Sequence, residues 1–126
     1  MEILLVDDNE EFLDSTKDVL EVEGYEVFTA KKGEDAIRMV GEQPFEVILM
    51  DIKMSGLSGV ETFIEMKKIN PSVKVIMVTA YSVESLIRQA LEEGAYAVFK
   101  KPLNMSVLLK EIDIIIKSKK TVGEQF

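Results

Sequence analysis

Short apolar runs alternate with amphipathic helical patterns five times along the chain, and this alternation limits its fold more than any other feature. Uninterrupted apolar tetrads occupy residues 3–6, 47–50 and 75–78, as expected for parallel strands covered on both faces. Residues 26–30 are more mixed in polarity, which favours an edge strand, and residues 96–99 form a fifth short run. Five such units predict an α/β fold: a doubly wound, five-stranded parallel sheet flanked by five helices.

The helical segments carry apolar residues at intervals of three and four. The two fullest stripes are Val83, Leu86, Ile87, Ala90 and Leu91, and then Met105, Leu108, Leu109, Ile112, Ile115 and Ile116. Ser82 and Asn104 are expected to cap these last two helices. The periodicity ends at Lys117, so we expect residues 1–117 to form one domain and 118–126 a tail or the start of a linker.

Composition removes several classes of chemistry. The chain of 126 residues has no cysteine and no histidine, which excludes disulfides, thiol nucleophiles, histidine general bases and metal sites built on either residue. A net charge of −8 disfavours direct nucleic-acid binding. The first apolar run has only four residues, which predicts neither a signal peptide nor a membrane span, so we expect a cytoplasmic protein.

Polar residues follow the predicted strands at the points where the strands end. Asp7 and Asp8 follow the first apolar run, Asp51 the third and Thr79 the fourth, and Lys101 closes the segment after the fifth. Because the carboxyl ends of parallel strands share one edge, where ligands bind in such folds, we expect these side chains to form one pocket. Each residue alone is commonly a loop acid, a strand-end hydroxyl or a solvated lysine, and only their joint placement favours a site.

The residue types of this pocket suit phosphoryl chemistry. Three carboxylates repel one another unless a cation neutralises them, and oxygen ligands favour Mg²⁺, with Mn²⁺ as the alternative. A lysine and a threonine hydroxyl can both bind the oxygens of a phosphoryl group. The chain has no glycine-rich phosphate loop, so we expect an attached phosphoryl group, with a carboxylate as the nucleophile that forms an aspartyl phosphate.

Four segments in order resemble the receiver domain of two-component response regulators, including the chemotaxis-type single-domain receivers. They are residues 4–9 (LLVDDN), 48–59 (ILMDIKMSGLSG), 78–81 (VTAY), and 94–95 (GA) with 101–103 (KPL). The resemblance covers nearly the whole chain. It implies a flavodoxin-like fold with strand order 2-1-3-4-5.

The resemblance also implies the metal ligands and the acceptor. Asp51 resembles the acceptor that takes phosphate from the phosphohistidine of a sensor histidine kinase or phosphotransfer protein. Asp8 and Asp51 resemble direct Mg²⁺ ligands, with the Lys53 carbonyl as a third, and Asp7 resembles the acid that holds the ion through water.

Two further residues resemble the phosphate-sensing groups of the family. Thr79 is similar to the hydroxyl that moves onto the phosphate, and Lys101 to its salt-bridge partner. Lys101 is preferred to Lys100 because it directly precedes Pro102, and the family pattern predicts a cis bond there.

By resemblance, the chain is a phosphorylation-activated signalling switch and catalyses only its own phosphotransfer and slow dephosphorylation. The fourth helix, fifth strand and fifth helix would form the face that dimerises or docks an unknown output partner or domain. Val107 and Ile114 lie outside the core stripe of the last helix, which predicts either a contact surface or a broad buried face.

The chain departs from the family pattern at Ser55, usually proline, which predicts a looser loop. It also departs at Val98, often an aromatic residue, which argues against gating by a rotating ring.

Two other functions fit part of the pattern. A Mg²⁺-dependent phosphatase would use the same aspartate nucleophile, but such enzymes usually carry an acid two residues further on, where this chain has Lys53. A degenerate receiver that serves only as a scaffold is disfavoured by the intact set of acids and by Lys101.

Overall fold

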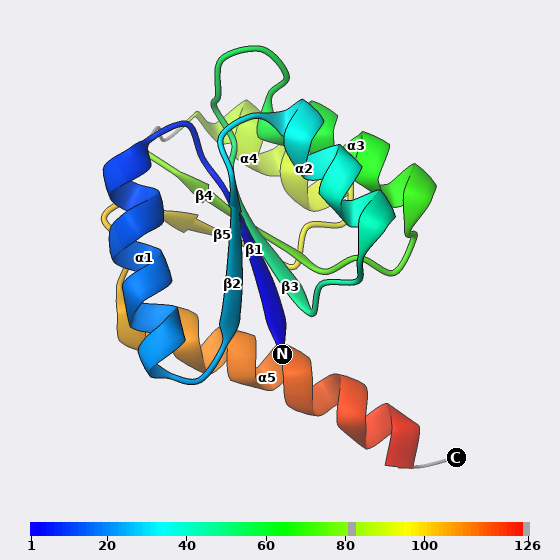
Figure 1. Ribbon diagram of the computed structural model, residues 1–126. Helices are drawn as coiled ribbons and strands as arrows, with labels where there is room; N and C mark the ends of the chain where they lie inside the picture. Colours follow the sequence, from blue (N-terminus) through cyan, green and yellow to red (C-terminus); the bar gives the residue numbers. More distant parts are fainter. Residues whose placement is uncertain (81–82, 125–126) are drawn as a thin grey trace.

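The structure is a computed structural model that describes residues 1–80 and 83–124, and of residues 119–124 the backbone only. Within this part, strands and helices alternate along the chain (Figure 1). The elements are β1 (Glu2–Val6), α1 (Glu10–Val22), β2 (Glu26–Ala30), α2 (Gly33–Glu42), β3 (Val47–Asp51), α3 (Gly59–Ile69), β4 (Val75–Thr79), α4 (Glu84–Glu92), β5 (Ala97–Lys100) and α5 (Met105–Glu124).

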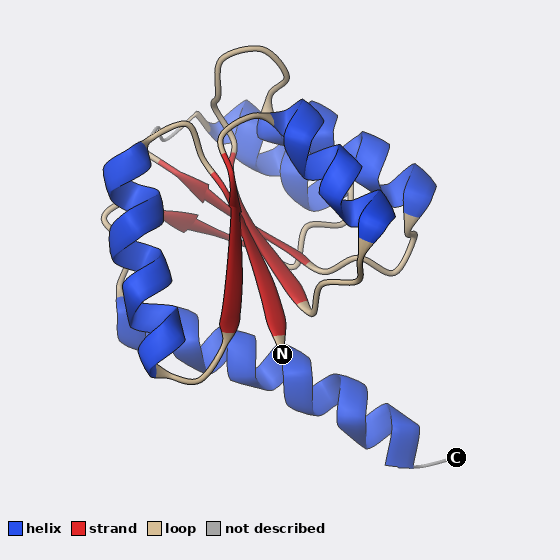
Figure 2. Ribbon diagram, in the orientation of Figure 1, coloured by secondary structure: helices blue, strands red, loops and turns tan. Residues whose placement is uncertain are grey.

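The strands form one parallel sheet in the order β2-β1-β3-β4-β5, which confirms the predicted topology. The three apolar tetrads lie in β1, β3 and β4, the interior strands, where every tetrad residue is buried. The more polar β2 is an edge strand, as its mixed pattern predicted. Interior strands are apolar because both of their faces are covered by helices (Figure 2).

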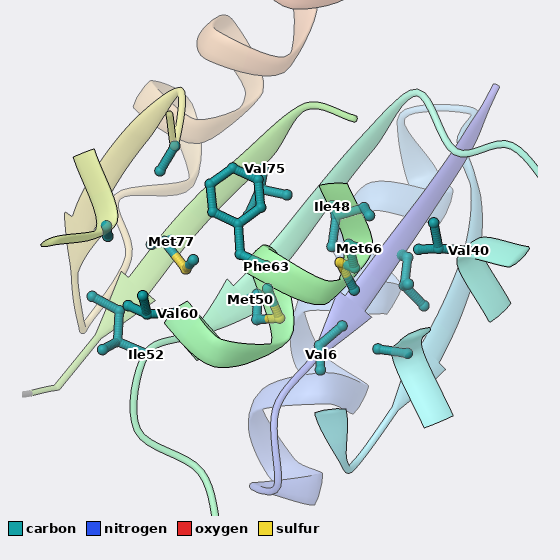
Figure 3. Close-up of a cluster of buried hydrophobic side chains, with 14 of the residues drawn as sticks. Val6, Val40, Ile48, Met50, Ile52, Val60, Phe63, Met66, Val75 and Met77 are labelled. Atoms are coloured by element: carbon teal, nitrogen blue, oxygen red, sulfur yellow. The ribbon is translucent and has the colours of Figure 1, made fainter. Parts of the chain in front are cut away.

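Helices α1 and α5 cover one face of the sheet, and α2, α3 and α4 cover the other (Figure 1). Each face therefore has its own core. Leu20 of α1 and Ile112 of α5 are fully buried on the first face. On the second, Phe63 and Met66 of α3 lie among the side chains of β3 and β4 (Figure 3), and Phe63 is 1% exposed.

Local sequence signals account for several helix starts. The Asn9 side chain accepts a hydrogen bond from the Phe12 N–H and caps α1. Ser58 and Glu61 form a reciprocal capping box at α3. Asn104 accepts from the Val107 N–H at 3.2 Å, as expected for the cap of α5. Ser82, expected to cap α4, lies outside the described residues.

Two helices differ in detail from the apolar periodicity of their sequences. In α4 only Ala90 is fully buried, while Val83 and Leu91 at the ends of the predicted stripe are 38% and 48% exposed. The reason is that α4 packs beside the edge strand β5, which covers a narrow part of its apolar face. Helix α5 continues to Glu124, past the end of its apolar periodicity, because helical backbone does not require a buried stripe. The division of the chain at residue 117 stays a prediction.

The exposure of the second stripe on α5 decides between the two alternatives for that stripe. Val107 and Ile114 are each 45% exposed, which rules out the broad buried face.

No helix within the described ranges is long and apolar enough to cross a membrane.

Candidate functional site

Three carboxylates converge at the carboxyl edge of the sheet. Asp7 and Asp8 directly follow β1, and Asp51 is the last residue of the neighbouring strand β3. One oxygen of each carboxylate lies within 4.8 Å of the other two. Asp7 and Asp51 are buried, whereas Asp8 is exposed. The fold thus brings together the acids that the sequence placed at the ends of separate strands.

Lys101 supplies the positive charge of this cluster. Its ammonium Nζ lies 2.6 Å from Asp7 Oδ2 and 3.5 Å from Asp51 Oδ2, and its side chain is only 17% exposed. Lys100 is exposed and lies on β5. The lysine that reaches the acids is therefore the one that precedes Pro102, and the bond between these two residues is cis, as predicted.

The ring of Phe12 also contacts this ammonium. Lys101 Nζ lies 4.2 Å from the ring centroid, which is cation–π geometry. Phe12 is half-buried at the start of α1, and its apolar pattern indicated only that it marks this helix. No sequence signal shows that a helix residue will meet a lysine in the loop after β5.

Asp51 has a perturbed proton affinity. Burial, followed by the nearby negative charge of Asp7, raises the pKa of Asp51 from 3.8 to about 6. Lys101 and the hydrogen bond from the Lys53 N–H to Asp51 Oδ1, at 3.3 Å, act in the opposite direction. Because burial and Asp7 make ionisation of Asp51 costly, a further cation bound beside it would stabilise its charged form.

Thr79 is as buried as Asp7 and more buried than Asp51 and Asp8. It ends β4, is 1% exposed, and its carbonyl accepts the Lys101 N–H at 2.8 Å. The neighbouring Ala80, not Thr79, lines the cavity that opens beside Asp51. This cavity has a volume of about 590 Å³, and its lining comprises Asp7, Asp8, Asn9, Asp51, Lys53, Met54, Ser55, Ser58, Ala80 and Lys101.

The loop between β3 and α3 forms one wall of this cavity. The Gly59 N–H donates to the Ile52 carbonyl at 2.7 Å and closes the base of the loop. The Ser55 N–H in the middle of the loop donates to Asp8 Oδ2 at 3.1 Å. Sequence reasoning expected Ser55 only to loosen the loop, and no residue-type signal could reveal a bond made by its backbone.

The donor set fits a hard divalent cation. The cluster contains carboxylate oxygens only, within a distance that one ion can span, and the Lys53 residue of the same cavity offers a carbonyl oxygen. Asp7 uses Oδ2 for Lys101 and Oδ1 for the Asn9 N–H at 2.9 Å. Both of its oxygens therefore already have a partner within the protein.

Two other residues named from the sequence lie differently. Val98 is half-buried on β5 and packs against the core of the α2–α3–α4 face. Because the residue is valine, this position has no aromatic ring that could rotate. Tyr81, the last residue of the third motif, lies outside the described residues.

Residues 3–113 match the response regulator receiver domain family. The chain is 34% identical over 103 residues to sporulation initiation phosphotransferase F of Bacillus subtilis, covering 82% of this chain and 83% of that protein. It is 37% identical over 108 residues to transcriptional regulatory protein ZraR of Klebsiella oxytoca, covering 86% of this chain. The match spans only 24% of the ZraR length.

A solved structure shares the fold and is similar in sequence. The response regulator protein TrrA from Thermotoga maritima, in complex with Mg²⁺-BeF, has a TM-score of 0.82 and 31% identity, covering 90% of this chain and 97% of that one. The chain therefore belongs to the response regulator receiver domain family, the phosphorylation-activated switches of two-component signal transduction.

Proposed function

We propose that Asp51 accepts a phosphoryl group from the phosphohistidine of a sensor histidine kinase or phosphotransfer protein. The observation that carries this proposal is the convergence of Asp7, Asp8 and Asp51, two of which, Asp7 and Asp51, also pair with the ammonium of Lys101. A carboxylate oxygen of Asp51 forms the new bond to phosphorus, the bond from phosphorus to the histidine nitrogen breaks, and the imidazole keeps the electron pair.

The acids of the cluster would hold the cation that this transfer requires. Asp8, Asp51 and the Lys53 carbonyl would be its protein ligands, and Asp7 would contact it through water. When bound, Mg²⁺ supplies positive charge that offsets the carboxylates and the transferred phosphoryl oxygens; Mn²⁺ suits the same ligands. Asp7 meanwhile keeps Lys101 in place through the 2.6 Å ion pair.

An apolar cavity beside the acceptor supports contact with a phosphodonor protein. It has a volume of about 500 Å³ and is lined by Phe12, Ser15, Thr16, Val19, Lys101, Pro102, Leu103 and Met105. Lys101 lines both this cavity and the acidic one. A donor seated against α1 and the loop after β5 would therefore present its phosphohistidine next to Asp51.

Phosphorylation would shift the population of the chain from one conformation to another. Thr79 and Lys101 would bind the phosphoryl oxygens only in the phosphorylated state, so they bias the equilibrium. The responding face would be α4–β5–α5. This part of the chain has four exposed apolar residues: Leu91 of α4, Tyr96 just before β5, and Val107 and Ile114 of α5. That face would dock an output partner or a second copy of the chain.

The remaining parts of the proposal follow from the same role. The chain would turn over only its own acyl phosphate, by slow hydrolysis, which resets the switch. Lys53 supports this switch function over a phosphatase that acts on other substrates. Such an enzyme usually has an acid two residues after its nucleophile, where this chain has Lys53. The cytoplasm is the compartment in which histidine kinase domains would reach it.

Incubation with a small-molecule phosphodonor and Mg²⁺, followed by intact-mass measurement, tests the proposal. The wild type should gain one phosphoryl group, and neither the Asp51→Asn variant nor the wild type with EDTA should do so. Asp14→Asn on the exposed face of α1 is the matched control and should gain it normally. No mass gain by the wild type would leave the scaffold function ahead, and turnover of generic phosphate esters would favour a phosphatase.

A further inference from the structure

One hydrogen bond joins the loop after β3 to the loop after β1. The peptide N–H of Ser55 donates to Asp8 Oδ2 at 3.1 Å, and the two residues are 47 positions apart in the chain. Both residues are exposed and both line the acidic cavity. The donor is a backbone group, so only proline among the usual residues would remove it.

The bond adds to the other hydrogen bonds that hold the loop, among them the Lys53 N–H to Asp51 Oδ1 at 3.3 Å. At the base, the Ile52 N–H donates to the Val78 carbonyl at 3.0 Å and the Gly59 N–H donates to the Ile52 carbonyl at 2.7 Å. At the far end, Ser58 is held by the capping box of α3. The Ser55 bond ties the middle of the loop to the segment that follows β1, and thereby also limits where the nearby Lys53 can lie.

The same bond orders Asp8, which is the exposed acid of the cluster. An exposed carboxylate samples several rotamers, and an ion that binds it must immobilise it. The Ser55 N–H uses one acceptor site, on Asp8 Oδ2. A carboxylate has about four such sites, so Asp8 can still bind a metal ion. The partial positive charge of the N–H also offsets repulsion among carboxylates that lie within 4.8 Å of one another.

We propose that the Ser55 peptide N–H is a positioning group for cation binding, an inference that rests on the proposed function. It holds the Asp8 carboxylate and the Lys53 segment near their ligating positions before the ion arrives. The ion then binds with a smaller ordering cost. Ser55 acts through Asp8 and the loop, and it is not itself a ligand.

A pair of substitutions at the same position separates the N–H from the side chain. Ser55→Pro removes the N–H, whereas Ser55→Ala keeps it and changes only the hydroxyl. Mg²⁺ titrations followed by amide chemical shifts should give about two- to tenfold weaker binding for Ser55→Pro, the range expected for losing one hydrogen bond, and wild-type affinity for Ser55→Ala. Equal or tighter Mg²⁺ binding by Ser55→Pro would overturn the proposal.

A second measurement uses the metal-free protein and does not depend on the folding of the proline variant. The Ser55 amide should exchange its hydrogen slowly in the wild type and faster in Asp8→Ala, and an unchanged rate would overturn the proposal. The wild-type titration tests the proposed function separately. If the wild type does not bind Mg²⁺, or Asp51→Asn binds it equally well, the proposed function itself fails.

Discussion

Replacing Asp51 by asparagine should stabilise the metal-free protein at neutral pH. Burial and the charge of Asp7 raise the pKa of Asp51 to about 6, against 3.8 for the exposed carboxyl of an unfolded chain. The folded state therefore binds this proton more tightly than the unfolded state. The resulting stability is fully present below pH 3.8 and is lost as the pH rises through about 6. Above that pH the wild type carries an ionised, buried carboxylate that the variant lacks.

The size of the effect follows from the same values. The interval from 3.8 to about 6, at about 1.36 kcal/mol per pH unit, gives an upper bound of about 3 kcal/mol. The Asp51 side chain is 10% exposed and faces an open cavity, so solvent screens part of this energy. We expect a net gain of about 1–2 kcal/mol at about pH 7.5.

Urea unfolding followed by circular dichroism, in EDTA at pH values from about 4 to about 8, measures this gain. The unfolding midpoint of Asp51→Asn should exceed that of the wild type by about 0.5–1 M at about pH 7.5, and the gap should close towards pH 4. The exposed Asp14→Asn variant should stay within about 0.5 kcal/mol of the wild type throughout. A less stable Asp51→Asn protein, or a gap independent of pH, would refute this electrostatic reasoning.

Two further substitutions test the geometry of the site. Lys101→Met should raise the pKa of Asp51 above about 6, because Lys101 lowers it. Carboxyl NMR titration of the metal-free protein should show this rise, and the exposed Lys100→Met variant should not show it. A pKa shift of equal size in both variants would contradict the role given to Lys101. Gly59→Ala should cost about 1–3 kcal/mol in urea unfolding, because a Cβ there would lie 2.2 Å from the Asp51 carbonyl oxygen. Gly41→Ala, with open space around its Cβ, should be neutral or stabilising, and equal costs at the two glycines would show that the close approach does not matter.

The sheet and the convergence of the acids could be predicted because they depend on patterns along the chain. Apolar tetrads mark the strands that are covered on both faces, and a parallel sheet places the residue after each strand at one edge. Asp7, Asp51 and Lys101 meet there for that reason alone. The strand order itself was implied by the family resemblance and not by the periodicity.

The contacts that complete the site could not be predicted, because they depend on packing between distant segments. Phe12 meets Lys101 only once α1 lies beside the loop after β5. The Ser55 bond to Asp8 uses a backbone N–H, which every residue except proline possesses. The exposure of Leu91 also follows from tertiary structure, because the apolar stripe of α4 is wider than the part that the edge of the sheet covers.

The central claim is that residues distant in sequence form one divalent-cation site at the carboxyl edge of the sheet. Paramagnetic broadening of amide signals by a small amount of Mn²⁺ tests it most directly, because broadening depends on distance from the ion. The account predicts that signals from residues 7–9, 51–55, 80 and 101 broaden together, and that Asp51→Asn weakens the effect. Broadening centred on other acidic surfaces, such as Glu92 and Glu93, or broadening that Asp51→Asn leaves unchanged, would contradict it.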